Sequence, residues 1–378
     1  MPSTDTTSWY ANPAARTWRT AAPSSALAYH QTLEGYAPTP LTPLPQLAAE
    51  LGVGQVFLKN ESDRLGLPAF KILGASCAVC RAICERFSLD ASGITVPELR
   101  DYLTANVPAG QVPILVTATD GNHGRAVSRM ARLLGLKARI YIPKGLSDAA
   151  IEGIKGEGAE LIPLELTYDD VVQAAAESAE GNPLDLLVQD TSWPGYEDIP
   201  RWIVDGYTTL FTEIDQQLAV LGYDGPDLVA CPVGVGSLAH SLVDHYRSNG
   251  HPHPSLLSVE PETAACIARS LLAGEPITVD TSFPTIMSGL NCGTPSELGW
   301  PSLLAGLDAA ISVSEDECRQ AVVDLNALGQ DAGPCGAATL AGVRTALQGE
   351  GRRRDLNIGP ESILVLVSTE GLDANPLR

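Results

Sequence analysis

Lys71 is the residue whose type and position best fit covalent chemistry. It follows a Pro-Ala-Phe stretch and precedes a helix that we predict over residues 73–86. Cations are uncommon at the start of a helix, because the helix dipole disfavours them there. An amine in apolar surroundings near a positive dipole has a depressed pKa, which suits attack on a carbonyl group. Taken by itself, Lys71 would be better interpreted as a solvated loop lysine.

A cluster of polar side chains follows the strand that we predict over residues 111–119. Thr119, Asp120, Asn122 and His123 bring a hydroxyl, a carboxylate, an amide and an imidazole into one loop that also contains two glycines. An Asx-type turn that caps the next helix is the simpler interpretation. It leaves the glycines and the other polar groups unexplained, so the loop is a candidate site.

A glycine-rich turn lies between a predicted strand and a predicted helix further along the chain. It consists of Gly234, Val235, Gly236 and Ser237. Glycines let the backbone approach a ligand closely, and the N–H groups at a helix start favour an anion such as phosphate. The spacing is not that of a dinucleotide fingerprint, which belongs at the first strand-to-helix turn. A mononucleotide-like phosphate is the better functional interpretation, and a tight turn without a ligand is the alternative.

These candidates lie at the ends of short apolar segments that alternate with helical ones. We predict strands over residues 56–60, 111–119, 138–143, 159–164, 185–190, 227–234, 256–262 and 362–369. Such alternation favours a parallel sheet built from strand-helix-strand units, and open sheets of this kind bind ligands at the carboxyl ends of their strands. The first 45 residues, rich in Pro, Thr and Ala, are predicted to form an irregular arm.

Composition and charge narrow the class of protein. The chain has 378 residues, of which 44% are hydrophobic and 18% are charged, as expected of a globular protein. Its net charge of −21 repels a phosphate backbone and an anionic bilayer, so we expect neither a nucleic-acid nor a membrane partner. No apolar run of about 18 residues is present. Residues 1–18 do not follow the pattern of a signal peptide, so we expect a cytoplasmic location.

The cysteines do not indicate a disulfide scaffold in a chain of this length. Cys77, Cys80 and Cys84 share one face of a predicted helix and could be thiol ligands. No fourth ligand and no CxxC pair accompanies them, so small buried side chains are the better interpretation. We expect no metal site.

Four segments together resemble a known family. Lys71 within AFKILGAS, the loop TDGNHG, the turn PVGVGSL and the segment VSTEG occur in the order and spacing of the tryptophan-synthase-β-like, or fold type II, pyridoxal phosphate enzymes. The resemblance runs from about residue 41 to residue 371. Within the family, NESDRLGLPAFKILGAS, TATDGNHGR, VQDTSWPGYEDIP and TIMSGLNCGTPSELGW are most similar to the diaminopropionate ammonia-lyases. Pro68 and the segment TEGLDANP depart from the pattern.

The resemblance implies a role for each candidate around pyridoxal 5'-phosphate. Lys71 would hold the cofactor covalently through a Schiff base, and Asn122 would contact the hydroxyl side of its ring. The turn formed by Gly234, Val235, Gly236 and Ser237 would cradle the phosphate. Ser368, with Thr369 as the near alternative, would face the pyridine nitrogen. A neutral hydroxyl partner leaves that nitrogen largely unprotonated, which suits β-elimination.

Asp120 is the position that separates the subfamilies. Most dehydratases of this fold resemble SSGNHG in this loop, with a serine that helps to hold the substrate carboxylate. A carboxylate would repel that group, and it would attract a second ammonium group or act as a base. Asp190 is the second acid, although it could serve only as an N-cap. Thr119 and His123 complete the expected substrate contacts, and a diamino acid would supply the two amines.

The expected fold class is α/β, with two domains that each hold an open, mostly parallel sheet flanked by helices and with the cofactor in the cleft between them. Residues 71–187 would form the small domain, and residues 1–70 and 188–378 the large cofactor-binding domain. The implied reaction is elimination of ammonia from 2,3-diaminopropionate, which yields pyruvate and ammonia. Lys71 or Asp120 would remove the α-proton, and Asp190 would orient or protonate the leaving amine. The family leads us to expect a homodimer.

Two other functions stay open at this point. A serine or threonine dehydratase, or a β-replacement synthase, would share the fold and the cofactor, but Asp120 argues against it. A protein that binds pyridoxal phosphate or another anion without catalysis would need no covalent anchor, so Lys71 argues against it. Cys266 and Cys292 are expected near the mouth of the site. They could pair there, and two free thiols are an equal alternative.

Overall fold

The chain, seen in a computed structural model that describes residues 8–119 and 121–377, contains two separate β-sheets. The larger sheet has seven strands in the order β1-β10-β9-β8-β11-β3-β2, and the smaller has four in the order β6-β5-β4-β7. All pairings are parallel except those of the two edge strands β1 and β2. The predicted α/β fold with mostly parallel sheets is confirmed.

The bounds of the elements follow the predicted alternation of strands and helices. The strands are β1 (Trp9–Ala11), β2 (Leu41–Pro43), β3 (Gln55–Asn60), β4 (Ile114–Ala118), β5 (Lys137–Pro143), β6 (Glu160–Leu164), β7 (Asp185–Leu187), β8 (Leu228–Pro232), β9 (Ser255–Pro261), β10 (Ala309–Val313) and β11 (Ile363–Ser368). The helices are α1 (Leu27–His30), α2 (Pro45–Leu51), α3 (Ile72–Arg86), α4 (Val96–Asn106), α5 (Asn122–Leu134), α6 (Asp148–Gly156), α7 (Tyr168–Glu180), α8 (Asp198–Val220), α9 (Ser237–Tyr246), α10 (Cys266–Ala273), α11 (Trp300–Gly306), α12 (Glu315–Ala327), α13 (Pro334–Gln348) and α14 (Glu350–Asp355).

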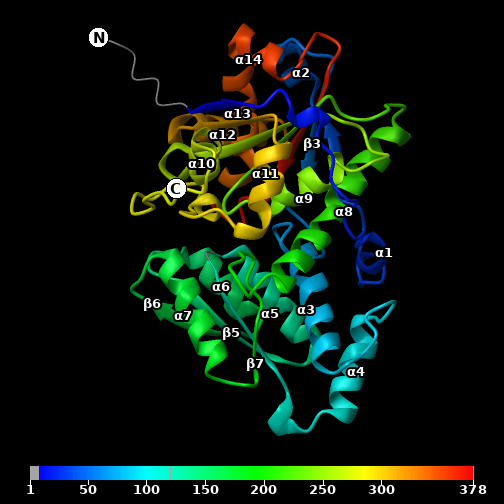
Figure 1. Cartoon of the computed structure of the whole chain (residues 1–378), viewed down its shortest axis with the longest axis vertical. Coiled ribbons are helices and arrows are strands. Elements are labelled where there is room, and N and C mark those ends of the chain that lie inside the picture. Colours follow the sequence, from blue (N-terminus) through cyan, green and yellow to red (C-terminus); the bar gives the residue numbers. More distant parts are fainter. Residues whose placement is uncertain (1–7, 120, 378) are drawn as a thin grey trace.

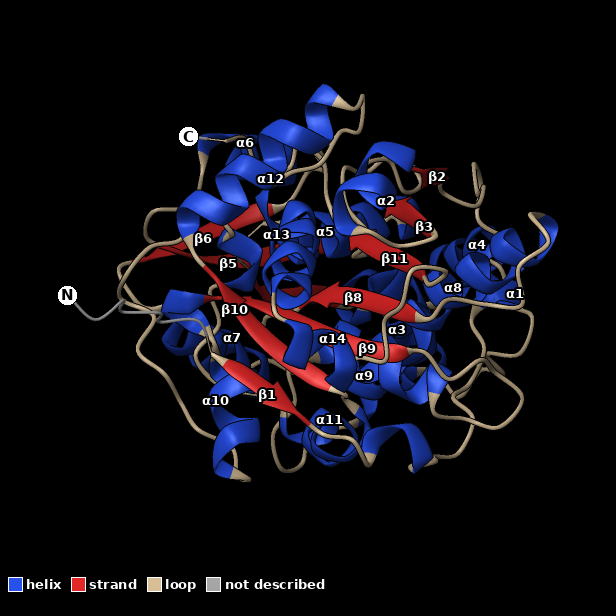
Figure 2. Cartoon of the chain, turned by 90° about the horizontal axis from the view of Figure 1, so that it is seen from above, coloured by secondary structure: helices blue, strands red, loops and turns tan. Residues whose placement is uncertain are grey.

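Helices cover both faces of the large sheet (Figure 2). Successive side chains of a strand point to opposite faces, and β11 illustrates the result. Leu364 and Leu366 belong to the core shared with α12 and α13, whereas Val365 and Val367 belong to the core shared with α8 and α9. Because β11 is buried on both sides, its sequence is a continuous apolar run, as expected of a central parallel strand.

Helices α3 and α8 pack against each other, with α3 beside α5 in the lower half of the molecule and α8 beside α9 in the upper half (Figure 1). These helices approach so closely that a Cβ on Gly206 would lie 2.4 Å from the carbonyl oxygen of Leu73, and one on Gly74 would lie 2.6 Å from the ring of Tyr207. The two glycines therefore permit the contact that fixes the start of α3 between the sheets. The strands of the small sheet lie within residues 114–187, but α3 packs against α8 as well as against α5, so the division at residues 71 and 187 stays a prediction.

The prediction of an irregular arm over the first 45 residues is wrong in part. Trp9–Ala11 pairs with β10, and Leu41–Pro43 pairs with β3, both in antiparallel register at the edges of the large sheet. Each strand has three residues and takes its hydrogen-bond partners from a distant part of the chain. Such short strands have too few residues to show the alternation by which a strand is recognised.

Five predicted strands end earlier than expected, and two of them lead to the loops that carry polar candidates. The strand predicted over residues 111–119 is observed at Ile114–Ala118, and the one predicted over residues 185–190 at Asp185–Leu187. The helix that follows the polar loop already begins at Asn122, within the loop's own motif. As a result, Asn122 and His123 lie in the first turn of α5, whereas Asp190 lies on the loop beyond β7.

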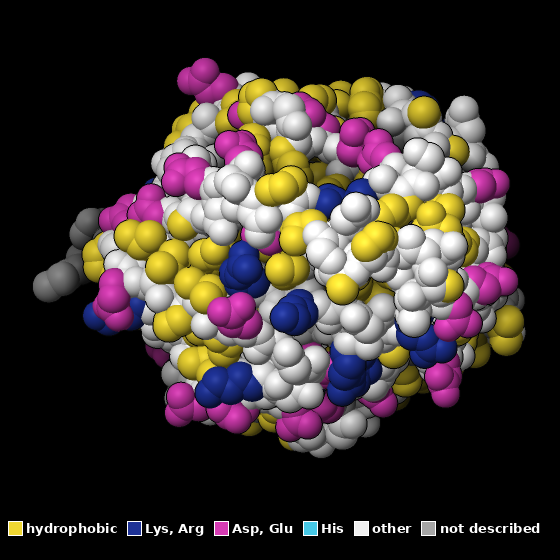
Figure 3. Space-filling view, turned by 90° about the horizontal axis from the view of Figure 1, so that it is seen from below, with side chains coloured by type: hydrophobic (Ala, Val, Ile, Leu, Met, Phe, Trp, Pro, Cys, Tyr) yellow, Lys and Arg dark blue, Asp and Glu magenta, His cyan; other side chains and the backbone are white. Residues whose placement is uncertain are grey.

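Charge and hydropathy of the described residues agree with the composition. None of the helices in the described part of the chain has both the length and the apolar composition needed to cross a bilayer. Seen from below, side chains of both charges are interspersed on the surface, with no broad area of positive charge alone (Figure 3). That face therefore offers no continuous track for a nucleic-acid backbone.

Candidate active site

Lys71 lies at the start of α3 and points to the end of the small sheet. It is the N-cap residue of the helix, and its Nζ donates a hydrogen bond of 2.6 Å to Oδ2 of Asp190. The Nζ also lies 5.4 Å from the centre of the Phe70 ring. The side chain of Lys71 is 22% exposed and that of Asp190 5%, so the pair is shielded but reachable from one side. Two residues that lie 119 positions apart are thus brought together as predicted.

Asp190 is ionised in this environment. Burial by itself raises the pKa of its carboxyl group, but the attraction to Lys71 and His123 and the hydrogen bond from Lys71 outweigh burial and lower the pKa to about 2. Its backbone carbonyl accepts a hydrogen bond of 2.6 Å from Oγ of Ser237. This contact ties the loop after β7 to the glycine-rich turn, so the acid is held in place from two sides.

His123 faces the same carboxylate from the first turn of α5. Its Nε2 donates to the carbonyl oxygen of Val188 at 2.7 Å, which leaves Nδ1 as the lone-pair nitrogen, 3.9 Å from Oδ2 of Asp190. No hydrogen-bond partner of Nδ1 occurs among the described residues. Burial, together with the nearby Lys71, lowers the pKa of His123. The ring is therefore neutral at pH 7.

The loop before α5 is shaped by Thr119. Its Oγ1 accepts hydrogen bonds of 2.9 Å from the backbone N–H groups of both Gly121 and Gly124. The side chain is 1% exposed and does not line the pocket described below, so it holds the loop together. Asp120 lies outside the described residues.

The glycine-rich turn presents a row of unused donors. The backbone N–H groups of residues 234–239 donate to no acceptor in the described part of the chain. Gly236 has φ +103°, and a Cβ there would lie 2.8 Å from Leu303; a Cβ on Gly234 would lie 2.9 Å from Sγ of Cys292. Free N–H groups at the start of α9 form an anion-binding cradle. A cradle of this kind fits a phosphate group.

Asn122 and Glu370 form a pair that the sequence did not indicate. Nδ2 of Asn122 donates to Oε2 of Glu370 at 2.6 Å, while Oε1 of Glu370 accepts from the N–H of Cys335 and from Nδ2 of Asn375. Burial raises the pKa of Glu370, and the hydrogen bonds from these donors only partly offset the rise. Asn375 lies in the C-terminal segment that departs from the family pattern, so that segment contacts the site.

The structure distinguishes the two candidates at the end of β11. Ser368 is fully buried, and its Oγ lies 2.5 Å from the position that a Cβ on Gly336 of α13 would occupy. It has no hydrogen-bond partner among the described residues and does not line the pocket. Thr369 lines the pocket. The role of facing the pyridine nitrogen stays a prediction, and Thr369 is the better placed of the two.

One pocket at the carboxyl ends of the strands brings most of the predicted residues together. It is lined by Phe70, Lys71, Asn122, Tyr168, Asp190, residues 232–239, Gly289, Leu290, Cys292, Cys335, Thr369 and Glu370. Tyr168, Cys335 and Glu370 were missed. Tyr168 and Cys335 begin helices and belong to no polar motif, whereas Glu370 follows the predicted strand over residues 362–369 and could have been chosen on that ground.

The cysteines are all buried in the structure. Burial of Cys77, Cys80 and Cys84 on α3 confirms that they are small core side chains. Cys266 and Cys292 both lie beside Gly234. Sγ of Cys266 donates to the carbonyl oxygen of Gly234 at 3.6 Å, and Sγ of Cys292 lies 2.9 Å from the position that a Cβ on Gly234 would occupy. They line the turn as two thiols.

Comparison with known proteins gives the same picture. The profile of a family described as "Pyridoxal-phosphate dependent enzyme" matches residues 32–369. The diaminopropionate ammonia-lyase of Escherichia coli strain K12 is 36% identical over 91% of this chain and 86% of its own length. That of Salmonella typhimurium is 36% identical over 93% of this chain and 89% of its own length.

A solved structure agrees with these relatives. The Escherichia coli enzyme in complex with an aminoacrylate–pyridoxal phosphate azomethine intermediate has a TM-score of 0.85 and 32% identity, and the match covers 97% of this chain and 94% of that one. The same enzyme has been solved in complex with D-serine. With a family profile over residues 32–369 and a relative that is 36% identical over 91% of the chain, the chain belongs to the pyridoxal-phosphate dependent enzymes and, among them, to the diaminopropionate ammonia-lyases.

Proposed function

We propose that this chain eliminates ammonia from 2,3-diaminopropionate and releases pyruvate, with Lys71 and Asp190 as the central catalytic pair. The observation that carries the proposal is the 2.6 Å contact between Lys71 Nζ and Asp190 Oδ2 in a pocket that the N–H groups of residues 234–239 also line. In this reaction, 2,3-diaminopropionate and one molecule of water give pyruvate and two molecules of ammonia.

The residues present fit pyridoxal 5'-phosphate. Lys71 would hold it covalently, the N–H groups of residues 234–239 would bind its phosphate, and Asn122, oriented by Glu370, and Thr369 would contact its ring. When bound, pyridoxal phosphate withdraws electrons from the α-carbon of an attached amino acid and makes the α-proton removable.

Lys71 and Asp190 divide the proton chemistry between them. Once substrate has replaced it, the amine of Lys71 is free to accept the α-proton and to pass a proton to the leaving amine. The neighbouring amine of Lys71 lowers the pKa of Asp190, and a carboxylate that is stabilised by a nearby cation is suited to orient an ammonium group of the substrate. Of the two roles predicted for Asp190, we therefore propose orientation, with the neutral His123 as a positioning residue behind it.

Asp120 completes the proposal from the sequence alone. A carboxylate there would hold the second ammonium group of the substrate, or would remove the α-proton of one enantiomer. A charge-assisted hydrogen bond of about 1.5–3 kcal/mol corresponds to a preference on the order of ten- to a hundredfold. Asp120→Ser and Asp120→Asn should depress turnover of diaminopropionate unequally for the D and L forms, and turnover of serine should fall far less.

A substrate panel tests the function. Pyruvate formation is measured from D- and L-diaminopropionate, serine and threonine at matched cofactor occupancy. We expect diaminopropionate to be the preferred substrate. Preference for serine or threonine would instead favour a dehydratase. Serine belongs in the panel because the Escherichia coli enzyme has been solved in complex with D-serine. A homodimer and a cytoplasmic location are also proposed, and light scattering of the purified protein tests the former.

A further inference from the structure

A cluster of three potential metal ligands lies away from the pocket, at the opposite end of α9. Asp215 comes from α8, His245 from the last turn of α9, and His251 from the loop that leads to β9. The turn that faces the pocket begins α9, so about ten residues at 1.5 Å each, roughly 15 Å of helix, separate the two places. The mechanism proposed above uses none of the three side chains.

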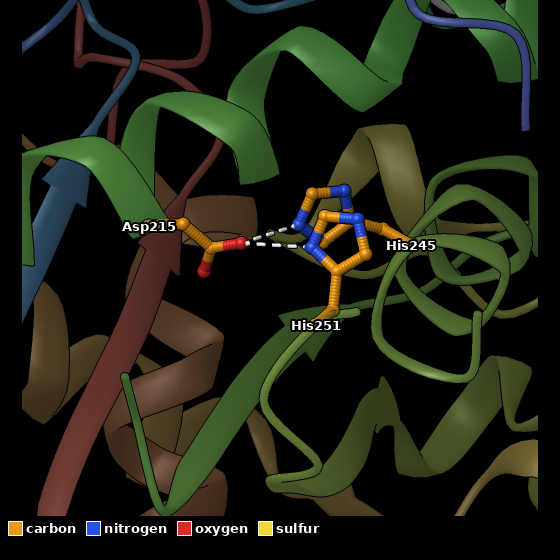
Figure 4. Close-up of side chains that lie close together, drawn as sticks. All are labelled: Asp215, His245 and His251. Atoms are coloured by element: carbon orange, nitrogen blue, oxygen red, sulfur yellow. Dashed lines mark hydrogen bonds and ion pairs between the residues drawn. The ribbon is translucent and has the colours of Figure 1, made fainter. Parts of the chain in front are cut away.

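The two imidazoles converge on a single carboxylate oxygen (Figure 4). Nε2 of His245 lies 2.7 Å and Nδ1 of His251 lies 3.3 Å from Oδ2 of Asp215. All three atoms lie within 4.8 Å of one another. Ligands on a tetrahedral zinc ion, at about 2.1 Å from the metal, are about 3.4 Å apart. The observed spacing therefore needs only small side-chain movements to admit an ion.

The surroundings hold these ligands in orientation. The hydroxyl of Tyr246 donates to the other oxygen of Asp215, Oδ1, at 3.1 Å, which leaves Oδ2 for the ion. The rings of His245 and His251 lie 4.1 Å apart, and Phe211 packs beside His245 at 5.9 Å. Outer hydrogen bonds and packing of this kind fix the ligands of protein metal sites.

Exposure of the cluster provides a path for the ion. The side chain of His245 is only 3% exposed, while those of Asp215 and His251 are 21% and 34% exposed. One side of the cluster is thus closed by the protein, and the other is open to a water ligand.

We infer that Asp215, His245 and His251 bind one divalent transition-metal ion of the zinc class, with solvent as the fourth ligand. Two imidazoles and one carboxylate suit zinc, copper or nickel, whereas calcium and magnesium prefer oxygen ligands throughout. The ion would clamp α8, the end of α9 and the loop over residues 247–254 to one another. Its role is to stabilise the large sheet's helical layer, and it takes no part in elimination.

Zinc binding to the holoenzyme tests the inference. The protein is treated with a chelator, dialysed, and titrated with zinc chloride; bound zinc per chain and the midpoint of thermal unfolding are measured. We expect one zinc per chain and a rise in the unfolding midpoint. His251→Ala and Asp215→Asn should each weaken binding at least tenfold and abolish the rise, with kcat for diaminopropionate unchanged.

His253→Ala is the matched control, because His253 lies in the same loop and contacts only the carbonyl oxygen of Tyr246 among the contacts described. It should bind zinc as the unaltered chain does. Absence of stoichiometric zinc binding in the unaltered chain would overturn the inference. Equal binding by His251→Ala and His253→Ala would do the same, since the zinc would then be held elsewhere.

Discussion

Two buried groups of charges lie close to α3 and α8, and they differ in how fully they are used. In the first, Lys59, Glu61, Arg64 and Glu213 form what we term the four-charge cluster, with every side chain at most 1% exposed. Lys59 donates to Glu213, Thr39 and Gln217 within 2.9 Å, and Arg64 makes two contacts to each of the glutamates. Two positive and two negative charges balance, and the donors are occupied.

The second group, around Lys71 and Asp190, lies next to polar groups whose hydrogen bonds are not all formed. Among the described residues, no donor reaches Nδ1 of His123. The N–H groups of residues 234–239 likewise have no acceptor there. Both groups contain a lysine 2.6 Å from a carboxylate whose pKa is lowered to about 2. An ion pair with a shifted pKa therefore does not by itself mark an active site. What distinguishes the site is the set of polar groups that have no hydrogen-bond partner within the described part of the chain and could bind a ligand.

The largest expected effect is on the amine of the site. Lys71→Ala removes the covalent anchor and the proton acceptor together, so turnover should fall by about 10³- to 10⁴-fold. The visible absorption band of the bound cofactor should also be lost. The variant should still fold, but its free energy of unfolding should fall by up to about 2 kcal/mol, because Asp190 loses its counter-ion. Turnover near that of the unaltered chain would remove Lys71 from the mechanism.

Removal of one member of the four-charge cluster should act on stability instead. Glu213→Ala leaves Lys59 and Arg64 without their shared counter-ion, and breaking a buried ion pair costs about 3–5 kcal/mol. Urea unfolding of the purified variant measures this loss. Tyr36→Phe, which removes only the 2.8 Å hydrogen bond to Glu213, is the milder companion. If either folded variant lost turnover in proportion to its loss of stability, the four-charge cluster would also serve catalysis, and the contrast between the two groups would be wrong.

The stability of the protein should depend on the charge of Asp190 at low pH. Its pKa lies near 2 in the folded chain against 3.8 ordinarily, so its ion pair contributes above pH 3.8 and is lost as the pH falls through 2. A shift of this size corresponds to about 2 kcal/mol. The difference in unfolding free energy between the unaltered chain and Asp190→Asn should narrow by that amount between pH 5 and pH 2. A constant difference would mean that Asp190 is not ion-paired.

A smaller effect is expected at the phosphate cradle. Gly236→Ala places a Cβ at φ +103° and 2.8 Å from Leu303, so the turn must shift and the affinity for pyridoxal phosphate should fall about tenfold, or about 1.4 kcal/mol. Gly222→Ala is the control, since Gly222 also has a positive φ, +85°, but open space around it. Titration of the apoprotein compares the two. Equal affinities would make the turn a purely structural one.

The sequence predicted the fold and the main site because both follow local patterns. Apolar strands alternate with amphipathic helices, and Lys71, Asn122, Asp190 and the glycine-rich turn stand at strand ends or helix starts, where parallel sheets place their ligands. The structure brings these residues into one pocket.

What the sequence did not indicate depends on contacts between distant segments. Glu370 faces Asn122 across 248 positions, and Asp215 meets His245 and His251 only because α8 packs against α9. Edge strands such as β1 exist only where a partner strand supplies their hydrogen bonds. Ser368 and Thr369 are neighbours, and the one-residue alternation of a strand end decides which of them enters the pocket.

The C-terminal segment after β11 has a practical consequence for work with this protein. Gly371 donates its N–H to the carbonyl oxygen of Pro68, three residues before the anchoring lysine, and Asn375 donates to Glu370 and to the carbonyl oxygen of Ile286. The last residues are thereby built into the wall that orients Asn122. Removal of residues 371–377 would break these contacts and disturb the pocket.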